Sequence, residues 1–168
     1  MVADQSARLV VSKTTMAVTH FGIFVVQDDE FERRLEIGTA KADIDDRGLG
    51  ITLASGEFGN LRDSPDYPVY PVGSTAAVMR RGRCWALVEQ EVKAGDPVWV
   101  RFTVDGNNKI VGALRKATAT GATAKVDSAR FASSSHIYRV KRYPDPEGTV
   151  AGITVQRYMV AMVDINLP

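Results

Sequence analysis

Apolar side chains recur at every second position over short stretches of this chain, and this alternation restricts the fold more than any other feature. The clearest case has four apolar residues on one face of an extended segment, Val98, Val100, Phe102 and Val104. A period of two is typical of a β-strand with one buried face, whereas an amphipathic helix needs spacings of three and four. Residues 97–104 are therefore predicted to form a strand.

Turn residues on both sides of that stretch predict a hairpin. Lys93-Ala94-Gly95-Asp96 precedes it and Asp105-Gly106-Asn107-Asn108 follows it, and residues 110–114 then resume the apolar run. Glycine and asparagine in a short link between two apolar runs are typical of a hairpin turn. A second hairpin is predicted from residues 76–80 and 84–89, which flank Arg81-Gly82-Arg83. Further strands are expected at 21–26, 51–53, 153–155 and 158–165.

Helical patterns are scarce. Residues 28–37 could form one or two turns, because Phe31 and Leu35 lie four apart. Many short strands separated by Gly and Pro favour an all-β fold. We expect a single small β-barrel or jelly-roll-like sandwich over residues 16–168. Residues 1–15 would form an N-terminal arm or edge strand, and a long loop would be inserted at about 132–150.

Charge and composition exclude several classes of partner. Lys plus Arg number 21 against 20 Asp plus Glu, a net charge of +1 that gives no reason to expect direct nucleic-acid binding. No apolar run approaches the ~20 residues that a membrane-spanning helix needs, and the first residues lack the pattern of a signal peptide. The single cysteine, Cys84, lies in an apolar run and is expected to be buried.

Motifs for chemistry are missing from the sequence. Only two histidines occur, His20 and His136, and neither lies in a nucleophile or zinc motif. The stretch from Asp43 to Gly48 begins like a calcium loop but has Arg47 and Ala54 where the ligands would be, so it is interpreted as a solvated turn. Asp28-Asp29-Glu30 is interpreted as an exposed acidic turn. We expect no catalytic, cofactor or metal site.

From residue 70 onward a succession of motifs resembles one family. Tyr70-Pro71-Val72-Gly73 is followed by an Arg-Gly-Arg-Cys-Trp-Ala-Leu-Val strand at 81–88 and by Val92-Lys93-Ala94-Gly95-Asp96-Pro97-Val98-Trp99-Val100. Ala129-Arg130-Phe131 and the ending Val163-Asp164-Ile165-Asn166-Leu167-Pro168 continue the match. In this order the motifs resemble those of tailed-bacteriophage structural cement proteins, which decorate capsids. Residues 132–158 depart from the pattern as an insertion.

The resemblance implies a non-enzymatic protein of the virion. It would be made in the host bacterial cytoplasm and would bind the outer surface of the expanded head, where it bridges subunits of the major capsid protein. A homodimer or homotrimer is expected, because a symmetric clip suits symmetric capsomers. No cofactor, nucleic acid or membrane is implied as a partner.

Aromatic and arginine residues on loops, and an apolar segment near the N-terminus, are candidates for the capsid or subunit interface. The apolar segment has no obvious sheet partner in the sequence, although an ordinary edge strand is an alternative for it. These candidates are Arg8, Leu9, Val10, Val11, Tyr67, Tyr70, Arg139 and Arg142.

Two alternatives remain open from the sequence. A different virion part, such as a head-completion or tail protein, would share the same β-rich composition. A glycan-binding adhesion module displayed on the virion would also use exposed Tyr and Trp side chains.

Arg80, Arg81 and Arg83 form a basic cluster in the sequence. The turn patterns place them at the tip of a hairpin, where they are interpreted as a solvated turn.

Overall fold

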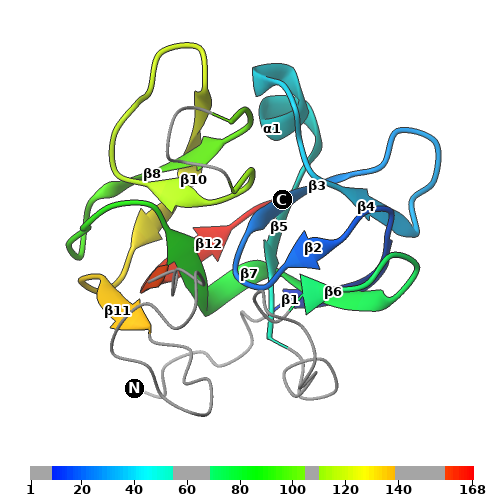
Figure 1. Cartoon of the computed structure of the whole chain (residues 1–168), viewed down its shortest axis with the longest axis horizontal. Coiled ribbons are helices and arrows are strands. Elements are labelled where there is room, and N and C mark those ends of the chain that lie inside the picture. The colour runs from blue at the N-terminus through cyan, green and yellow to red at the C-terminus, as the bar shows by residue number, and fades with distance from the viewer. Residues whose placement is uncertain (1–8, 55–68, 105–109, 139–157) are drawn as a thin grey trace, which may run out of the picture.

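The computed structural model describes residues 9–54, 69–104, 110–138 and 158–168. These residues form mainly strands, so the expected all-β fold is confirmed (Figure 1). In the first half the elements are β1 Leu9–Thr15, β2 Thr19–His20, β3 Phe24–Gln27, β4 Arg34–Glu36, α1 Lys41–Arg47, β5 Gly48–Thr52 and β6 Val69–Tyr70. In the second half they are β7 Thr75–Val88, β8 Pro97–Arg101, β9 Leu114–Arg115, β10 Thr123–Phe131, β11 His136–Tyr138 and β12 Tyr158–Asn166.

The long strand β7 belongs to two closed circuits of paired strands. The N-terminal circuit runs β1–β4–β3–β5–β7 and closes because β7 pairs back with β1. The C-terminal circuit runs β7–β9–β8–β10–β12 and closes because β12 pairs back with β7. Closing a sheet on itself leaves few free strand edges. The sheet is therefore a closed barrel with extra strands, in which β7 is common to both circuits.

The predicted hairpin at residues 81–83 is wrong, because β7 is one strand of 14 residues that continues through it. Gly82 has φ of +123°, a conformation that residues with a Cβ rarely adopt, so the chain continues there without turning back. On either side of Gly82 the strand has different partners: β1 pairs with residues 75–81 and β12 with residues 81–88. Arg80, Arg81 and Arg83 thus lie within a strand and not at a turn.

The hairpin that begins with residues 97–104 is present but has a longer connection than expected. Strand β8 pairs antiparallel with β9 through Trp99 opposite Arg115 and Val100 opposite Leu114. Residues 101–113 therefore separate the paired positions, and the predicted turn Asp105–Asn108 within that connection lies outside the described residues. Inward-facing Val98 and Val100 are buried as the alternation predicted, whereas Val104 is exposed.

The single helix of the described residues is not where the sequence suggested. Residues 28–37 contain the strand β4, with Leu35 fully buried, and the helix α1 lies at Lys41–Arg47 instead of a solvated turn. Its start depends on Asp43, whose carboxylate accepts hydrogen bonds from the backbone N–H groups of Thr39 and Ala40 at 2.8 and 2.9 Å. This is the reciprocal part of a capping box. Ala40 at the N-cap offers no side-chain signal.

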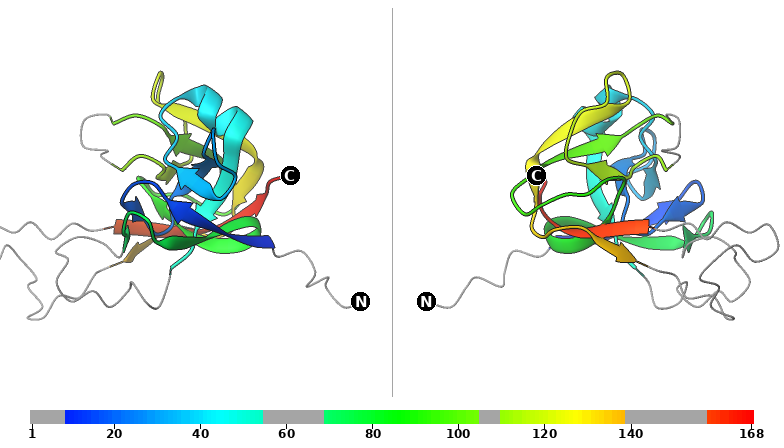
Figure 2. Two further views of the ribbon diagram at one scale, coloured as in Figure 1. Left: turned by 90° about the vertical axis from the view of Figure 1, so that its right-hand side faces the viewer. Right: turned by 60° about the vertical axis from the view of Figure 1, so that its left-hand side comes forward.

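Two groups of buried side chains fill the fold, one on each face of the strands that alternate between them. In β3, Phe24 and Val26 belong to the larger group and Val25 to the smaller. The larger group continues through β8, β10 and β12, and the smaller lies under β1 and β6. Figure 2 shows β1, β7 and β12 in one layer at the base of the molecule, with α1 on the opposite side.

Candidate protein-binding surface

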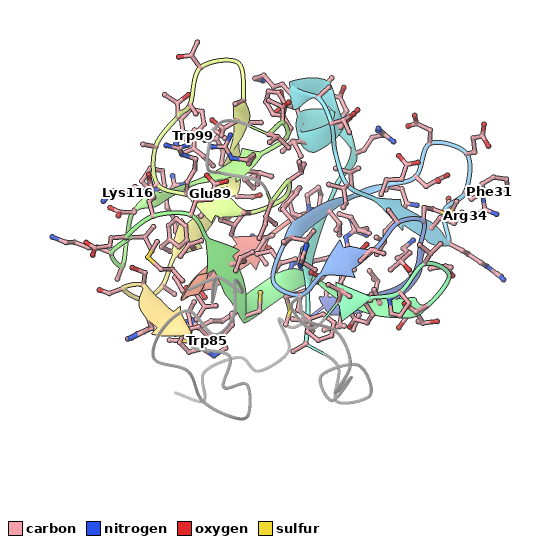
Figure 3. All side chains as sticks on the ribbon, viewed as in Figure 1. Phe31, Arg34, Trp85, Glu89, Trp99 and Lys116 are labelled. Carbon is pink, nitrogen blue, oxygen red and sulfur yellow. The ribbon has the colours of Figure 1, made fainter. Side chains whose placement is uncertain are left out.

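The outer face of β7 and β12 carries a half-exposed tryptophan. Alternation along β7 turns Cys84 and Ala86 into the core, so Trp85 between them points outward and is 51% exposed. Its cross-strand neighbour is Met162 of β12, which is partly exposed. Figure 3 shows Trp85 beside β11 at the base of the fold, away from α1. Trp85 is therefore exposed although it lies within the apolar run 84–88.

Neighbouring side chains hold this face in place. The ring of His136 in β11 lies edge-on to Trp85, with ring centroids 6.0 Å apart. Two residues before Trp85 in β7, Arg83 donates two hydrogen bonds to the carboxylate of Asp164 in β12, at 2.7 and 2.8 Å. The hydrogen bond from Arg83 lowers the pKa of Asp164, and the same bond raises the pKa of Arg83. The aromatic residue thus lies beside an ordered ion pair.

On the opposite side of the same strand, Cys84 is buried as the sequence predicted. Burial, with a smaller contribution from Asp164, raises the pKa of the Cys84 thiol to about 12. A thiol is nucleophilic only as its thiolate, and at neutral pH almost none of Cys84 would be ionised. Its role is that of a small apolar core residue.

The structure describes four of the eight residues proposed from the sequence as an interface. The other four, Arg8, Tyr67, Arg139 and Arg142, lie outside the described residues. Leu9–Val11 belong to an ordinary strand, the alternative that the sequence left open for this segment, because β1 pairs with β7 from Leu9 to Thr14. Leu9 and Val10 nevertheless remain 40% and 45% exposed.

Tyr70 is a core residue and not a surface anchor. It is 1% exposed, its hydroxyl donates to the carbonyl of Leu53 at 2.8 Å, and its ring packs edge-on against Phe21 with centroids 4.7 Å apart. The Pro-flanked sequence suggested a loop, but residues 69–70 form β6 and pair with β2. A tyrosine in this position fills the smaller core group and does not present its ring to a partner.

A second exposed aromatic residue lies at the other end of the molecule. Phe31 is 47% exposed, and the Arg34 guanidinium lies 4.0 Å from the centroid of its ring. The loop is ordered by Asp28, which accepts backbone hydrogen bonds from Glu30 and Phe31 at 2.9 and 2.8 Å. Partial burial acts to raise the pKa of Asp28, but these bonds, a side-chain hydrogen bond with Glu36 and the charge of Arg34 together lower it. The acidic turn is therefore only partly exposed, since Asp28 faces inward.

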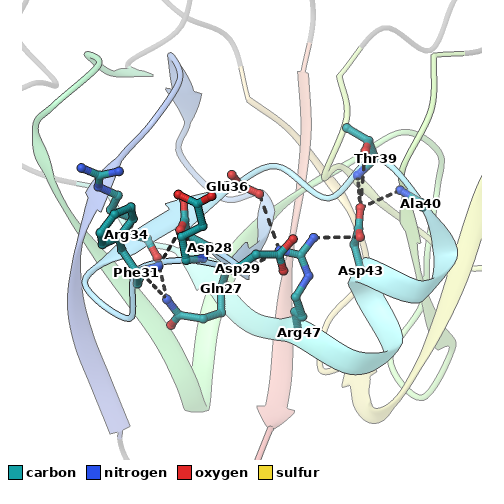
Figure 4. A network of polar contacts seen from close by, with 11 residues as sticks. Gln27, Asp28, Asp29, Phe31, Arg34, Glu36, Thr39, Ala40, Asp43 and Arg47 are labelled. Carbon is teal, nitrogen blue, oxygen red and sulfur yellow. Dashed lines mark hydrogen bonds and ion pairs between the residues drawn. The ribbon is translucent and has the colours of Figure 1, made fainter.

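Beside this loop, Arg47 at the end of α1 joins three carboxylates (Figure 4). It donates to Asp43 at 2.8 Å, contacts Glu36 at 3.6 Å and reaches Asp29. Its hydrogen bond is the main reason that the pKa of Asp43 is lowered. Partial burial and the nearby charge of Asp28 raise the pKa of Glu36. The network ties α1 to β3 and β4.

A buried ion pair lies in the C-terminal circuit. Arg101 of β8 has no exposed surface, and its guanidinium donates two hydrogen bonds to the carboxylate of Glu89. It donates a third to the backbone carbonyl of Thr103 at 3.1 Å, and Arg115 lies 3.6 Å from Glu89. Figure 3 shows Glu89 near Trp99 and Lys116 on this side of the fold. These bonds satisfy the buried charge and fix the end of β8 against the chain after β7.

Within the described ranges, no three His, Cys, Asp or Glu side chains are grouped as ligands for a metal ion. The part of the chain that the structure describes also holds no helix with the length and hydrophobicity to span a membrane.

The closed sheet with its extra strands defines the class of an all-β barrel protein. The particular family follows from the sequence. The family described as structural cement protein (E217 gp24/Pam3 gp6) matches residues 1–158, and the chain belongs to this family. It is a capsid cement or decoration protein, its place is in the phage virion, and it associates with capsid proteins.

A solved structure supports the fold. The chain is similar to a chain in the capsid of Myoviridae phage XM1, with a TM-score of 0.60 and 18% identity, over 99% of this chain and 88% of that one. No curated protein matches the chain. The sequence resemblance to cement proteins is therefore confirmed, and the family is one of structural proteins.

The sequence patterns did not place Trp85 on one surface with Arg81 and Arg83, although one signal for it was present. Arg81, Arg83 and Trp85 occupy alternate positions, which is the spacing of one face of a strand. The interpretation of Arg81–Arg83 as a turn interrupted that periodicity, so the three side chains were not assigned to one surface.

Proposed function

We propose that this protein binds the outer surface of the expanded phage head and bridges neighbouring subunits of the major capsid protein, without catalytic activity. The observation that carries the proposal, beyond the family itself, is the 51% exposure of Trp85 on an otherwise closed sheet. Tryptophan and arginine are the residues most enriched at interface hot spots. A large apolar ring held at the surface is costly to leave in water and gains most from a partner.

Stabilisation would follow from selective binding. A ligand that binds only the expanded lattice shifts the equilibrium towards it by mass action. Each bound copy needs to contribute only a small binding free energy. Once a copy is bound to one capsid subunit, its contact with the neighbouring subunit is intramolecular, and many copies act together on one head. The net charge of +1 suits a position outside the head, since it supplies no electrostatic attraction for the packaged DNA. Synthesis in the host cytoplasm and a homodimeric or homotrimeric clip belong to the same proposal.

Binding to purified heads tests this proposal. The protein is co-sedimented with expanded heads that lack it, with unexpanded procapsids as the control. We expect saturable binding to expanded heads alone, together with raised resistance of those heads to heat. Absence of binding to either particle contradicts a cement role and favours a tail component or an adhesion module.

A matched pair of variants tests the surface. Trp85→Ala and Phe31→Ala each remove an aromatic ring that is about half exposed, at two separate places on the molecule (Figure 3). Truncating a hot-spot aromatic residue costs about 2 kcal/mol or more, which is a loss of affinity of roughly 30-fold. We expect this loss for Trp85→Ala and an unchanged affinity for Phe31→Ala. The reverse result assigns head binding to the Phe31 loop.

A further inference from the structure

Strand β1 has one edge paired along its length and the other edge largely open. On one side it pairs with β7 from Leu9 to Thr14. On the other side β4 covers only Thr14 and Thr15, so no described strand lies beside residues 9–13 on that edge. In the left-hand view of Figure 2, β1 runs along the near side of the base layer. This edge lies at the surface of the described fold.

The direction of the backbone groups on the open edge follows from printed hydrogen bonds. The N–H groups of Thr14 and Met16 donate to the carbonyls of Arg33 and Leu35, at 2.8 and 3.3 Å, on the β4 side. The N–H of Thr15 donates to Ser74 at 3.0 Å, on the β7 side. Successive backbone groups alternate between the two edges of a strand. The N–H and C=O groups of even-numbered residues therefore point away from β7.

That alternation extends to Val10 without interruption. The register shift beside Leu9 places the extra residue in β7, because Val10 lies opposite Met79 and Leu9 opposite Arg81. β1 itself stays regular. Val10 and Ser12 consequently present two N–H donors and two C=O acceptors on the open edge, and within the described ranges no bonded partner for these groups is found.

The edge lacks the usual protection against pairing. Natural edge strands carry a proline or a central charge that prevents another strand from joining them. Residues 9–12 are Leu-Val-Val-Ser, with neither. The first charge is Lys13, and its amine is already engaged by the backbone carbonyl of Glu32. Leu9 and Val10, at 40% and 45% exposure, add apolar surface to the open backbone groups.

We infer that β1 pairs antiparallel with β1 of a second copy of this chain, with Val11 on the two-fold axis. In that register Val10 lies opposite Ser12 of the partner subunit, and the two residues exchange N–H···O bonds. The two-fold axis generates a second, identical pair from Ser12 and the partner's Val10. All four outward groups of each strand, the N–H and C=O of Val10 and of Ser12, are then bonded. The β7–β1 layer then continues through the partner's β1 and β7 as one sheet.

Charge and existing bonds favour this register and this occupant. Moving the pairing towards the C-terminus would require the N–H of Thr14, which is already bonded to Arg33. In the inferred register Lys13 lies opposite Leu9 of the partner subunit, so no like charges face each other. The outward N–H and C=O groups of Val10 on one chain match those of Ser12 on the other, and a two-fold interface requires such self-complementary surfaces. The inference rests on the self-association that the proposed function expects, and locates it.

The backbone N–H of Ser12 allows dimerisation to be tested without disturbing the fold. Ser12→Pro removes an outward N–H that the described fold does not use, whereas Ser12→Ala keeps it. We expect the wild type and Ser12→Ala to sediment as dimers and Ser12→Pro as a monomer with an unchanged circular dichroism spectrum. A monomeric wild type, or a Ser12→Pro dimer, overturns the inference.

Cross-linking tests the register independently. On the two-fold, Val11 faces its copy as a non-hydrogen-bonded pair, a geometry in which two cysteines can form a disulfide. Val11→Cys is expected to give a covalent dimer on mild oxidation, and Ser12→Cys is not. Cys84 is buried with a pKa of about 12 and serves as a silent background. A covalent dimer of Ser12→Cys alone contradicts the register.

Head binding distinguishes this inference from the proposed function. A wild-type monomer that still binds expanded heads overturns the inference and leaves the cement role intact. A wild-type dimer that does not bind heads supports the inference and contradicts the cement role. If the free protein is monomeric and Ser12→Pro weakens head binding, the open edge receives a strand of the capsid protein, and self-pairing is wrong.

Discussion

Arg47 and Arg101 are both surrounded by carboxylates, but the two circuits of the sheet place them in different surroundings. Arg47 lies beside the N-terminal circuit, 23% exposed, and shares three carboxylates. Arg101 lies in the C-terminal circuit, fully buried, with Glu89 as its main partner. Water can replace a partner that Arg47 loses, whereas it cannot reach Arg101. Removing a carboxylate partner should therefore lower the free energy of unfolding more at Arg101 than at Arg47.

The largest effect is expected from Glu89→Ala. Removing one member of a buried pair leaves an uncompensated charge and typically costs about 3–5 kcal/mol. We expect a fall of that size in the free energy of unfolding, measured by urea denaturation. The double variant Glu89→Leu with Arg101→Met removes both charges and should recover most of the loss. A single variant that loses less than about 1 kcal/mol would mean that Arg101 reaches water.

A smaller effect is expected from Asp43→Ala on the other arginine network. This change removes the two backbone hydrogen bonds at the start of α1 and one of several partners of Arg47. Loss of a cap typically costs about 1 kcal/mol, in the range of roughly 0.5–2. Asp45→Ala, in the same helix, removes only an exposed pair with Lys41 and should cost less than about 0.5 kcal/mol. Equal losses would argue against the capping role of Asp43.

The contribution of Asp43 should depend on pH. Its pKa in the folded protein is lowered, chiefly by the hydrogen bond from Arg47. Stability from a lowered carboxyl pKa is complete above the pKa of the unfolded chain and is lost as pH falls through the folded value. The difference in unfolding free energy between wild type and Asp43→Ala should therefore narrow on acidification. A difference that stays constant down to the acid transition contradicts this sign.

The smallest effect, of opposite sign, is expected from Glu36→Gln. The pKa of Glu36 is raised by partial burial and by the charge of Asp28. A raised carboxyl pKa means that ionisation costs stability as pH rises through the unfolded and then the folded value. Glutamine removes that cost, so we expect a slight gain at neutral pH that disappears in acid. Thermal melts at the two pH values measure it, and a loss at neutral pH would show that the contact with Arg47 dominates.

The fold class could be predicted from the sequence because alternation is a local property. Residues 97–101 and 158–166 form strands close to where the period of two places them. The path through residues 81–83 could not be predicted in this way. Arg-Gly-Arg suits a turn as well as a strand, and the choice depends on β1 and β12, which lie far away in the sequence.

The site illustrates the same limit. Burial of Cys84 was predicted, since a lone cysteine in an apolar run is usually internal. Exposure of its neighbour Trp85 was not, because an unbroken apolar run hides which face is outward. Tyr70 appeared to be a surface residue among prolines, yet the core group that encloses it comes from several distant strands. The helix start at Asp43 was missed because Ala40 gives no capping signal.

Sharing β7 between the circuits has a consequence for the order of events during synthesis. Every strand of the N-terminal circuit lies before residue 89, so that circuit can close while later residues are still on the ribosome. The C-terminal circuit must wait for β12, which follows all other strands in the sequence. The face around Trp85 is complete only when β12 docks on β7. An unfinished chain therefore lacks the complete face around Trp85.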